Sequence, residues 1–277
     1  MNLQGCGTAL ITPFRPDGGV DETALHAHVN WQIANGISLL IPVGTTGEAS
    51  TLSEAEWIRV IEVTVTAAAG RVPVFAGATH NATHQAVANV KKLGRISGLT
   101  GILTANPYYN RPGQRGQYEH FRAIAESTEL PILLYNIPAR TGANLEPDTV
   151  LRLAEIPNIV GIKESSGNLA QITELLTQAP RAFRIFSGDD ALALATLAVG
   201  GMGLISVASN AIPQQMSQLV PPLSATTGSP HAASIVTTLH SCRPSLWNPV
   251  RHPLRLCSTC LGGATKIFVF PWSQCPR

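Results

Sequence analysis

The sequence has few charged residues, few aromatic residues and no long apolar run. Charged side chains make up 13% of its 277 residues and the net charge is +2. No basic stripe alternates with aromatic residues, so we expect no nucleic-acid partner. The nearest approach to a membrane span, 191–212, is interrupted by glycine, serine, threonine and asparagine. No basic and apolar leader opens the chain, so we expect a cytoplasmic globular protein rather than a membrane or exported one.

Acidic residues and cysteines are unevenly distributed along the chain. No Asp or Glu follows Asp190, and Cys6 is the only cysteine before Cys242. Of the 19 basic and 17 acidic side chains, all the acids but only 14 bases lie in residues 1–221, which gives this part a charge of −3 and the remainder +5. The composition therefore changes near residue 221.

Short apolar runs that end in polar or glycine-rich turns recur along the chain. Each is rich in Val, Ile and Leu on both alternating faces, which is typical of a strand buried on both sides. The runs span 8–14, 37–44, 72–78, 99–109, 131–138, 158–167, 183–190 and 201–210. Helical signals lie between them, such as the capping box Ser53–Glu56.

This alternation of strands and helices predicts an α/β fold, a TIM (β/α)8 barrel with units of roughly 20–35 residues. A doubly wound open sheet is the alternative, but no GxGxxG fingerprint follows any of the predicted strands. In a barrel, the C-terminal ends of the strands face the active site.

Lys163 is the most informative residue at these strand ends. Burial disfavours a charged ammonium and lowers its pKa, which makes the amine a nucleophile able to form a Schiff base with a carbonyl. The alternative is a structural ion pair of Lys163 with Glu164 or Asp189.

Three further features are compatible with a small keto acid as the ligand. The hydroxyls of Tyr135 and Thr46 can both donate and accept a proton. The glycines of 43–48 let backbone N–H groups approach a carboxylate closely, and Arg140 suits its bidentate capture. Each feature also has an alternative interpretation without a ligand. Tyr135 could be a core tyrosine, 43–48 an ordinary turn, and Arg140 a solvated surface arginine.

The motifs "GTALITPF", "VGTTGEASTLS", "NPYYNRPGQ", "LYNIPART", "GIKESSGN" and "FSGDD" follow one another in this order. Over residues 1–220 the chain thereby resembles the dihydrodipicolinate synthase family of class I, pyruvate-dependent aldolases. The resemblance implies a Schiff-base condensation of pyruvate with L-aspartate 4-semialdehyde to give 4-hydroxy-tetrahydrodipicolinate, in lysine (diaminopimelate) biosynthesis. It implies neither a metal nor an organic cofactor.

The resemblance also implies a role for each matching residue. Lys163 would form the imine and Tyr135 would be the general acid/base, with Thr46 and Tyr109 completing a proton relay. In this family the second tyrosine of the pair reaches across a subunit interface, so a homo-oligomer, dimer or tetramer, is expected.

Binding residues follow from the same motifs. Thr45, Thr46 and adjacent amides would hold the pyruvate carboxylate, Arg140 would hold that of the semialdehyde, and Gly188 and Ile205 would line the pocket. A lysine-inhibitor site would fall on Ser50, Asn81, Gln85 and Tyr108. Because Gln85 stands where a glutamate commonly holds the lysine amine, we expect weak or absent inhibition.

Two alternatives remain beside the synthase. Another pyruvate-dependent enzyme, an N-acetylneuraminate lyase or a keto-deoxy sugar-acid aldolase, shares the lysine and tyrosine, although "NIPART" and "PYYNRP" favour the synthase. A catalytically impaired relative is the other.

Residues 221–277 do not resemble the helical region that ends this family. We predict an aberrant, irregular segment after a catalytic domain of 1–220, with an effect on a tetramer interface. Codons read in a displaced frame recover several of the family's residues, so we hypothesise a frameshift near codon 221, which resequencing of the gene tests. The pair Cys257 and Cys260 then reads as chance rather than as half of a zinc site.

Overall fold

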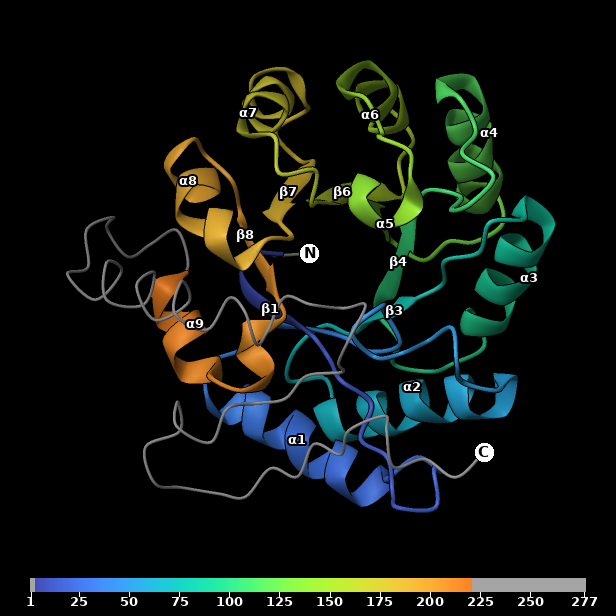
Figure 1. Cartoon of the computed structure of the whole chain (residues 1–277), viewed down its shortest axis with the longest axis vertical. Helices are drawn as coiled ribbons and strands as arrows, with labels where there is room; N and C mark the ends of the chain where they lie inside the picture. Colours follow the sequence, from blue (N-terminus) through green and yellow to red (C-terminus); the bar gives the residue numbers. More distant parts are fainter. Residues whose placement is uncertain (1–2, 221–277) are drawn as a thin grey trace.

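The computed structural model describes residues 3–220 of the 277 (Figure 1). The predicted aberrant segment, the frameshift hypothesis and the pair Cys257 and Cys260 therefore lie outside the described residues. In the described part, no helix is long and apolar enough to cross a membrane.

The described residues form a barrel of parallel strands surrounded by helices (Figure 1). The strands are β1 (Gly5–Ala9), β2 (Leu39–Ile41), β3 (Phe75–Gly77), β4 (Gly101–Ala105), β5 (Ile132–Asn136), β6 (Ile159–Glu164), β7 (Arg184–Ser187) and β8 (Gly203–Ser206). Their order in the 8-stranded sheet is β2-β1-β8-β7-β6-β5-β4-β3. A parallel bridge between Leu40 and Val74 joins the segments at its two edges and closes the ring. The predicted TIM barrel is confirmed, and the open sheet is wrong.

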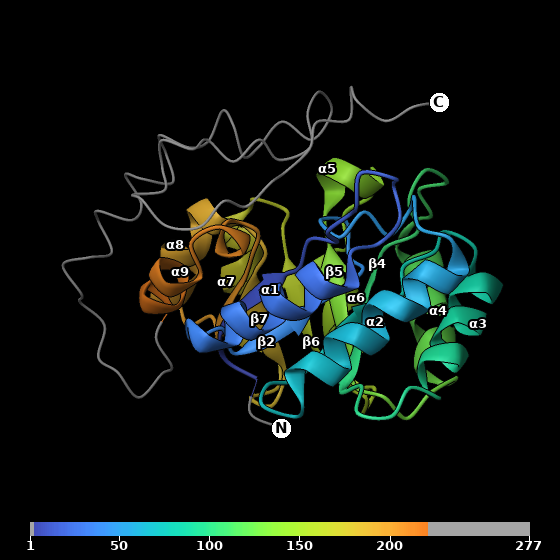
Figure 2. The same ribbon diagram turned by 90° about the horizontal axis from the view of Figure 1, so that it is seen from below.

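Helices follow the strands and cover the outside of the ring. They are α1 (Glu22–Ala34), α2 (Glu54–Ala68), α3 (Thr83–Leu93), α4 (Gln114–Ala125), α5 (Pro138–Thr141), α6 (Pro147–Leu153), α7 (Leu169–Gln178), α8 (Ala193–Ala198) and α9 (Pro213–Leu219), with short 3-10 turns η1 (Asp190–Leu192) and η2 (Ala208–Asn210). The predicted capping box of Ser53 and Glu56 begins α2. Figure 2 shows α5 at one end of the barrel, directly after the C-terminal end of β5.

The first strand is the one whose position the sequence predicted wrongly. We expected it over 8–14, whereas β1 spans Gly5–Ala9. The glycines of β1 interrupt the apolar pattern by which the other strands were predicted. They are required because the neighbouring strands leave no room for side chains there. A Cβ on Gly7 would lie 3.0 Å from the Leu39 Cβ, and one on Gly203 would lie 2.1 Å from the Gly5 carbonyl oxygen. Close backbone approach, rather than an apolar pattern, defines this strand.

Two apolar cores result from the alternation along the strands. One lies inside the ring and includes Leu39, Leu133, Phe186 and Ile205. The other lies between strands and helices and is built from the intervening strand residues, such as Ile162, together with helix residues. Because successive side chains of a strand point to opposite faces, Lys163, next to Ile162, points into the barrel.

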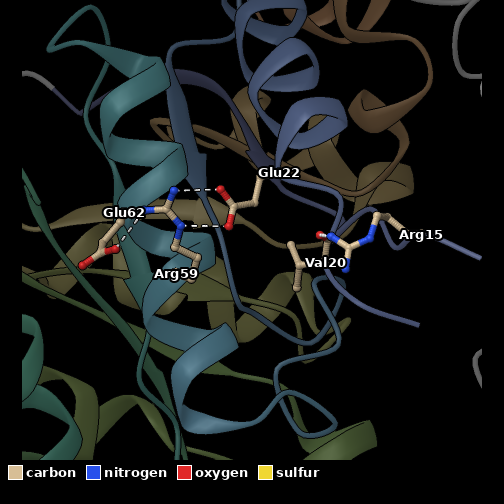
Figure 3. A network of polar contacts seen from close by, with 5 residues as sticks. All are labelled: Arg15, Val20, Glu22, Arg59 and Glu62. Atoms are coloured by element: carbon tan, nitrogen blue, oxygen red, sulfur yellow. Dashed lines mark hydrogen bonds and ion pairs between the residues drawn. The ribbon is translucent and has the colours of Figure 1, made fainter. Parts of the chain in front are cut away.

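The helices α1 and α2 lie side by side on the flank of the barrel in both views (Figures 1 and 2). Arg59 on α2 bridges to Glu22 on α1, with Nη2 to Oε2 at 2.7 Å, and to Glu62 at 3.3 Å (Figure 3). In the loop before α1, Arg15 Nη1 donates to the carbonyl oxygen of Val20 at 2.7 Å. These charged groups are exposed, so water and salt screen them and they add little to stability.

Candidate active site

Lys163 lies near the C-terminal end of β6 and is 3% exposed. The sheet register places it between Tyr135 on β5 and Phe186 on β7. Its Nζ is 4.4 Å from the centre of the Tyr135 ring. The lysine is therefore enclosed by the barrel, with the face of the Tyr135 ring beside its amine.

Burial makes the Lys163 amine less basic. It lowers the pKa of Lys163 from 10.5 to about 8, with a smaller contribution from the positive charge of Arg140, while Asp190 opposes the change. Within residues 3–220, Lys163 forms no ion pair, so the structural pair with Glu164 or Asp189 is not observed. About a tenth of the amine is thus unprotonated at pH 7, far more than for an ordinary lysine, and this form can attack a carbonyl.

Tyr135 pairs with Lys163 across the β5–β6 ladder and is 8% exposed. Burial raises the pKa of Tyr135 to about 12, although the charge of Arg140 opposes this rise. The phenol therefore stays protonated near neutral pH and is placed to give and take a proton beside the amine.

The turn after β7 packs tightly against Lys163. A Cβ on Gly188 would lie 1.9 Å from Ser165 Oγ and 2.8 Å from Lys163 Cε. Any side chain at this position would displace the lysine or the serine, so Gly188 limits the space around the amine. Ile205, on β8, is fully buried and belongs to the core inside the barrel.

Ser165 is a candidate that the sequence did not single out. Its Oγ is buried and makes no hydrogen bond of ordinary geometry among the described residues, but it lies close enough to the Tyr135 hydroxyl to lower the pKa of that phenol slightly. Ser165 is therefore a neighbour of the Tyr135 hydroxyl and of Lys163. The signal in the sequence was weak, since a serine in a turn is common.

The turn that follows β2 is shaped by left-handed backbone conformations at Val43 (φ 49) and Glu48 (φ 56). Thr45 is exposed and Thr46 is half-buried. Within the described residues, the backbone N–H groups of Thr45 and Thr46 donate no hydrogen bond, whereas those of Gly47 and Glu48 donate within the turn. Two free amides side by side suit a carboxylate.

Arg140 lies on α5, a single helical turn that follows β5, and its side chain is exposed. Its charge acts on the pKa of both Lys163 and Tyr135. Within residues 3–220, Arg140 has no carboxylate partner in an ion pair. The guanidinium is therefore available at the end of the barrel that holds the lysine.

Tyr109 does not enter the site of its own chain. Its side chain is 89% exposed, and its backbone is left-handed, with φ 72. Tyr108 beside it is 38% exposed. An L-residue held at positive φ is strained, which indicates that the loop has a fixed conformation.

Few hydrogen bonds connect the segments that carry the four residues of the expected lysine site. Asn110 Nδ2 donates to the carbonyl oxygen of Asn81 at 3.3 Å, which connects the loop of Tyr108 to the β3–α3 turn. Gln85 Nε2 donates to Asn89 Oδ1 at 3.0 Å, along α3. Ser50 is exposed, and no hydrogen bond among the described residues joins its side chain to Asn81, Gln85 or Tyr108.

Among residues 3–220, no three His, Cys, Asp or Glu side chains gather as metal ligands.

Known proteins share this fold and much of this sequence. A sequence model of the dihydrodipicolinate synthetase family matches residues 2–243. The chain is 62% identical over 221 residues to 4-hydroxy-tetrahydrodipicolinate synthase of Acidobacterium capsulatum, which covers 79% of this chain and 73% of the relative.

Solved structures agree with the sequence relatives. The 4-hydroxy-tetrahydrodipicolinate synthase of Methylacidiphilum fumariolicum SolV is 44% identical, has a TM-score of 0.84 and covers 90% of this chain and 83% of that one. A dihydrodipicolinate synthase from Acinetobacter baumannii, complexed with pyruvate, is 40% identical, with a TM-score of 0.82 over 89% of this chain and 85% of that one.

A parallel barrel with a buried lysine at a strand end is the arrangement of a class I aldolase, and the family match assigns the chain to that class. Within that class, the chain belongs to the dihydrodipicolinate synthetase family.

Proposed function

We propose that this chain is a 4-hydroxy-tetrahydrodipicolinate synthase. It condenses pyruvate with L-aspartate 4-semialdehyde in lysine (diaminopimelate) biosynthesis. The observation that carries the proposal is Lys163, enclosed beside Tyr135 and with its pKa lowered to about 8, in a chain of this family.

Catalysis begins at Nζ of Lys163. The unprotonated amine attacks the ketone carbon of pyruvate, and loss of water gives a protonated imine. This cation draws electrons from the pyruvate methyl group, which releases a proton and becomes an enamine carbon nucleophile. That carbon attacks the aldehyde of the semialdehyde, whose amine then closes the ring and frees Lys163.

Each proton transfer needs a group that can both donate and accept. Tyr135 lies beside the amine and remains a neutral phenol near pH 7, because burial raises its pKa to about 12. Thr46 would pass protons onward, and Tyr109 would complete the relay. A relay of hydroxyls adds no net charge to the enclosed site.

Two carboxylates orient the substrates. The free amides at Thr45 and Thr46 suit the pyruvate carboxylate, and Arg140, exposed and without an ion-pair partner among the described residues, suits that of the semialdehyde. Gly188 and Ile205 would line the pocket, since Gly188 lies against Lys163 and Ile205 faces the barrel interior.

The exposed Tyr109 supports a homo-oligomer, either a dimer or a tetramer. A tyrosine that is 89% exposed does not pack into its own barrel beside the buried amine, so it would serve a neighbouring subunit. We assign this enzyme to the cytoplasm, where its substrates would be supplied.

Lysine would act on this chain weakly. The residues Ser50, Asn81, Gln85 and Tyr108 would form the inhibitor site, and Gln85 offers a neutral amide in place of a carboxylate. That amide is engaged with Asn89. A neutral group gives a lysine ammonium less stabilisation than an ion pair would.

Borohydride trapping tests the proposal. Incubation of the full chain with pyruvate and borohydride should add one reduced pyruvyl group at Lys163, located by intact mass and peptide mapping. A Lys163→Ala variant is the control and should gain none. An ordered, unlabelled wild-type chain would instead favour a catalytically impaired relative and contradict the proposal.

If wild type is labelled, a fresh sample that has not been treated with borohydride is then assayed for turnover in the presence of pyruvate. Consumption of aspartate 4-semialdehyde, and none of N-acetylneuraminate or keto-deoxy sugar acids, is the expected result. The reverse preference would contradict the assignment of the second substrate.

A further inference from the structure

A buried carboxylate, Glu164, follows Lys163 on β6 but has no cation beside it. Glu164 is 1% exposed, and no ion pair among residues 3–220 includes it. Its oxygens accept hydrogen bonds from the backbone N–H of Ser166 at 2.6 Å, from Asn136 Nδ2 at 3.0 Å and from Gln171 Nε2 at 3.0 Å. Burial raises the pKa of Glu164, and these hydrogen bonds oppose the rise.

A carboxylate buried among neutral donors stabilises a fold less than an apolar residue of the same size would. Its presence at this position therefore suggests a role other than stability. Glu164 points away from the imine site, because Lys163 precedes it on the strand and faces the barrel interior. Its use is therefore not direct contact with pyruvate.

The donors that hold Glu164 also hold the segment that carries Arg140. Asn136 Nδ2 donates to Asn144 Oδ1 at 2.8 Å, and Asn136 Oδ1 accepts from the Leu145 backbone N–H at 3.0 Å. Asn144 Nδ2 donates to Gln171 Oε1 at 2.9 Å. One network thus joins β5, β6 and α7 to the end of the segment 137–146, which includes α5.

The segment is fixed from its other side by α4. Gln114 Nε2 and Gln117 Nε2 donate to the carbonyl oxygen of Asn144 at 2.9 Å and 3.1 Å. Arg140 itself is exposed. The segment that carries the guanidinium is therefore anchored at residues 143–145, by Asn106 as well as by this network, and Glu164 is the acceptor that orients Asn136 and Gln171.

We propose that Glu164 is a positioning residue that fixes segment 137–146, and with it Arg140, relative to Lys163. This inference rests on the proposed function, in which Arg140 binds the carboxylate of the semialdehyde. Bidentate capture requires a fixed guanidinium, and a displacement of about 1 Å is enough to lower the rate of the step that depends on it. The affinity for the second substrate is thus the quantity that Glu164 controls.

The substitution Glu164→Gln tests this directly. It keeps the size of the side chain but turns an NH2 group toward Asn136 or Gln171, whose amides already donate there. Glu174→Gln is the matched control, since it neutralises an exposed glutamate on α7. Both variants are made in the full chain.

Steady-state kinetics with both substrates, together with borohydride trapping, give the readout. For Glu164→Gln we expect the KM for the semialdehyde to rise about tenfold, the size of effect of a disrupted buried hydrogen bond. The KM for pyruvate and the labelling of Lys163 should stay as in wild type, as should every value for Glu174→Gln. Equal losses for both substrates would indicate general damage to the fold and would overturn the inference.

A second variant covers a failure of Glu164→Gln to fold. Asn144→Ala removes the side-chain hydrogen bonds of Asn144 to Asn136 and Gln171 but leaves Glu164 all three of its donors, and it should show the same selective rise in KM. An unchanged KM for the semialdehyde in a folded variant overturns the inference about Glu164 but leaves the proposed function intact. Absence of imine and of turnover in the wild-type chain overturns the proposed function itself.

Discussion

At the scale of single residues, the chemistry depends on one amine that the fold makes unusual. Lys163 is an ordinary lysine in sequence, and only enclosure by the barrel lowers its pKa to about 8. The sequence predicted this position because a lysine at the end of an apolar strand is rare. It left open whether Glu164 or Asp189 would neutralise the amine, since side-chain direction decides this.

Burial of Lys163 should cost stability in a pH-dependent way. A drop in pKa from 10.5 to about 8 means that the folded state disfavours the ammonium, by about 3 kcal/mol at neutral pH. The cost is full below the folded pKa, falls as the pH rises between the two values and is absent above 10.5.

Lys163→Met should therefore raise the free energy of unfolding at pH 7, and the gain should shrink as the pH rises from about 8 to 10.5. Urea unfolding across this pH range measures it, with the exposed Lys91→Met as control. A gain that does not change with pH would contradict the lowered pKa.

At the scale of elements, a buried polar cluster joins α1 and η2 to β1, beside the pairing of the first and last strands. Thr8 Oγ1 on β1 donates to Gln32 Oε1 on α1 at 2.7 Å, and Gln32 Nε2 donates to the carbonyl oxygen of Ser209 on η2 at 2.8 Å. Sequence patterns predicted the helices and most strands, yet they could not pair Thr8 with residues some 200 positions away. Such contacts follow from ring closure.

The fully buried Gln32 should matter more for stability than the exposed Arg59 clamp of Figure 3. Gln32→Met would leave the Ser209 carbonyl and the Thr8 hydroxyl without this partner, at a cost of about 3 kcal/mol. Arg59→Met removes only solvent-screened ion pairs and should lower stability less. Denaturant midpoints at unchanged m-value compare the two, and a larger loss for Arg59→Met would contradict this ranking.

At the scale of the whole molecule, a complete site is proposed to need two subunits. Tyr109 is exposed on its own chain, whereas Tyr135 lies beside Lys163. The predicted segment 221–277 and its frameshift stay predictions, because they fall outside the described residues.

Co-expression of two impaired chains tests the shared site. Lys163→Ala and Tyr109→Phe should each lose most activity, and together they should recover part of it, because a mixed oligomer contains sites with both wild-type residues. Lys163→Ala with Tyr135→Phe is the control and should not recover, since each site would lack one of them. Equal activity of both mixtures would contradict the exchange of Tyr109.

The sequence by itself determined the barrel, the family and the lysine. These depend on local periodicity, on motifs within a few residues and on the rarity of a charge in an apolar run. Only the tertiary structure decided where β1 begins and that the hydrogen-bond donors around Glu164 are neutral. It alone also decided that a side chain at Gly188 would clash with Lys163 and Ser165, and that Tyr109 is exposed. Each depends on what a distant strand, helix or turn places beside the residue, and no pattern along one segment contains that information.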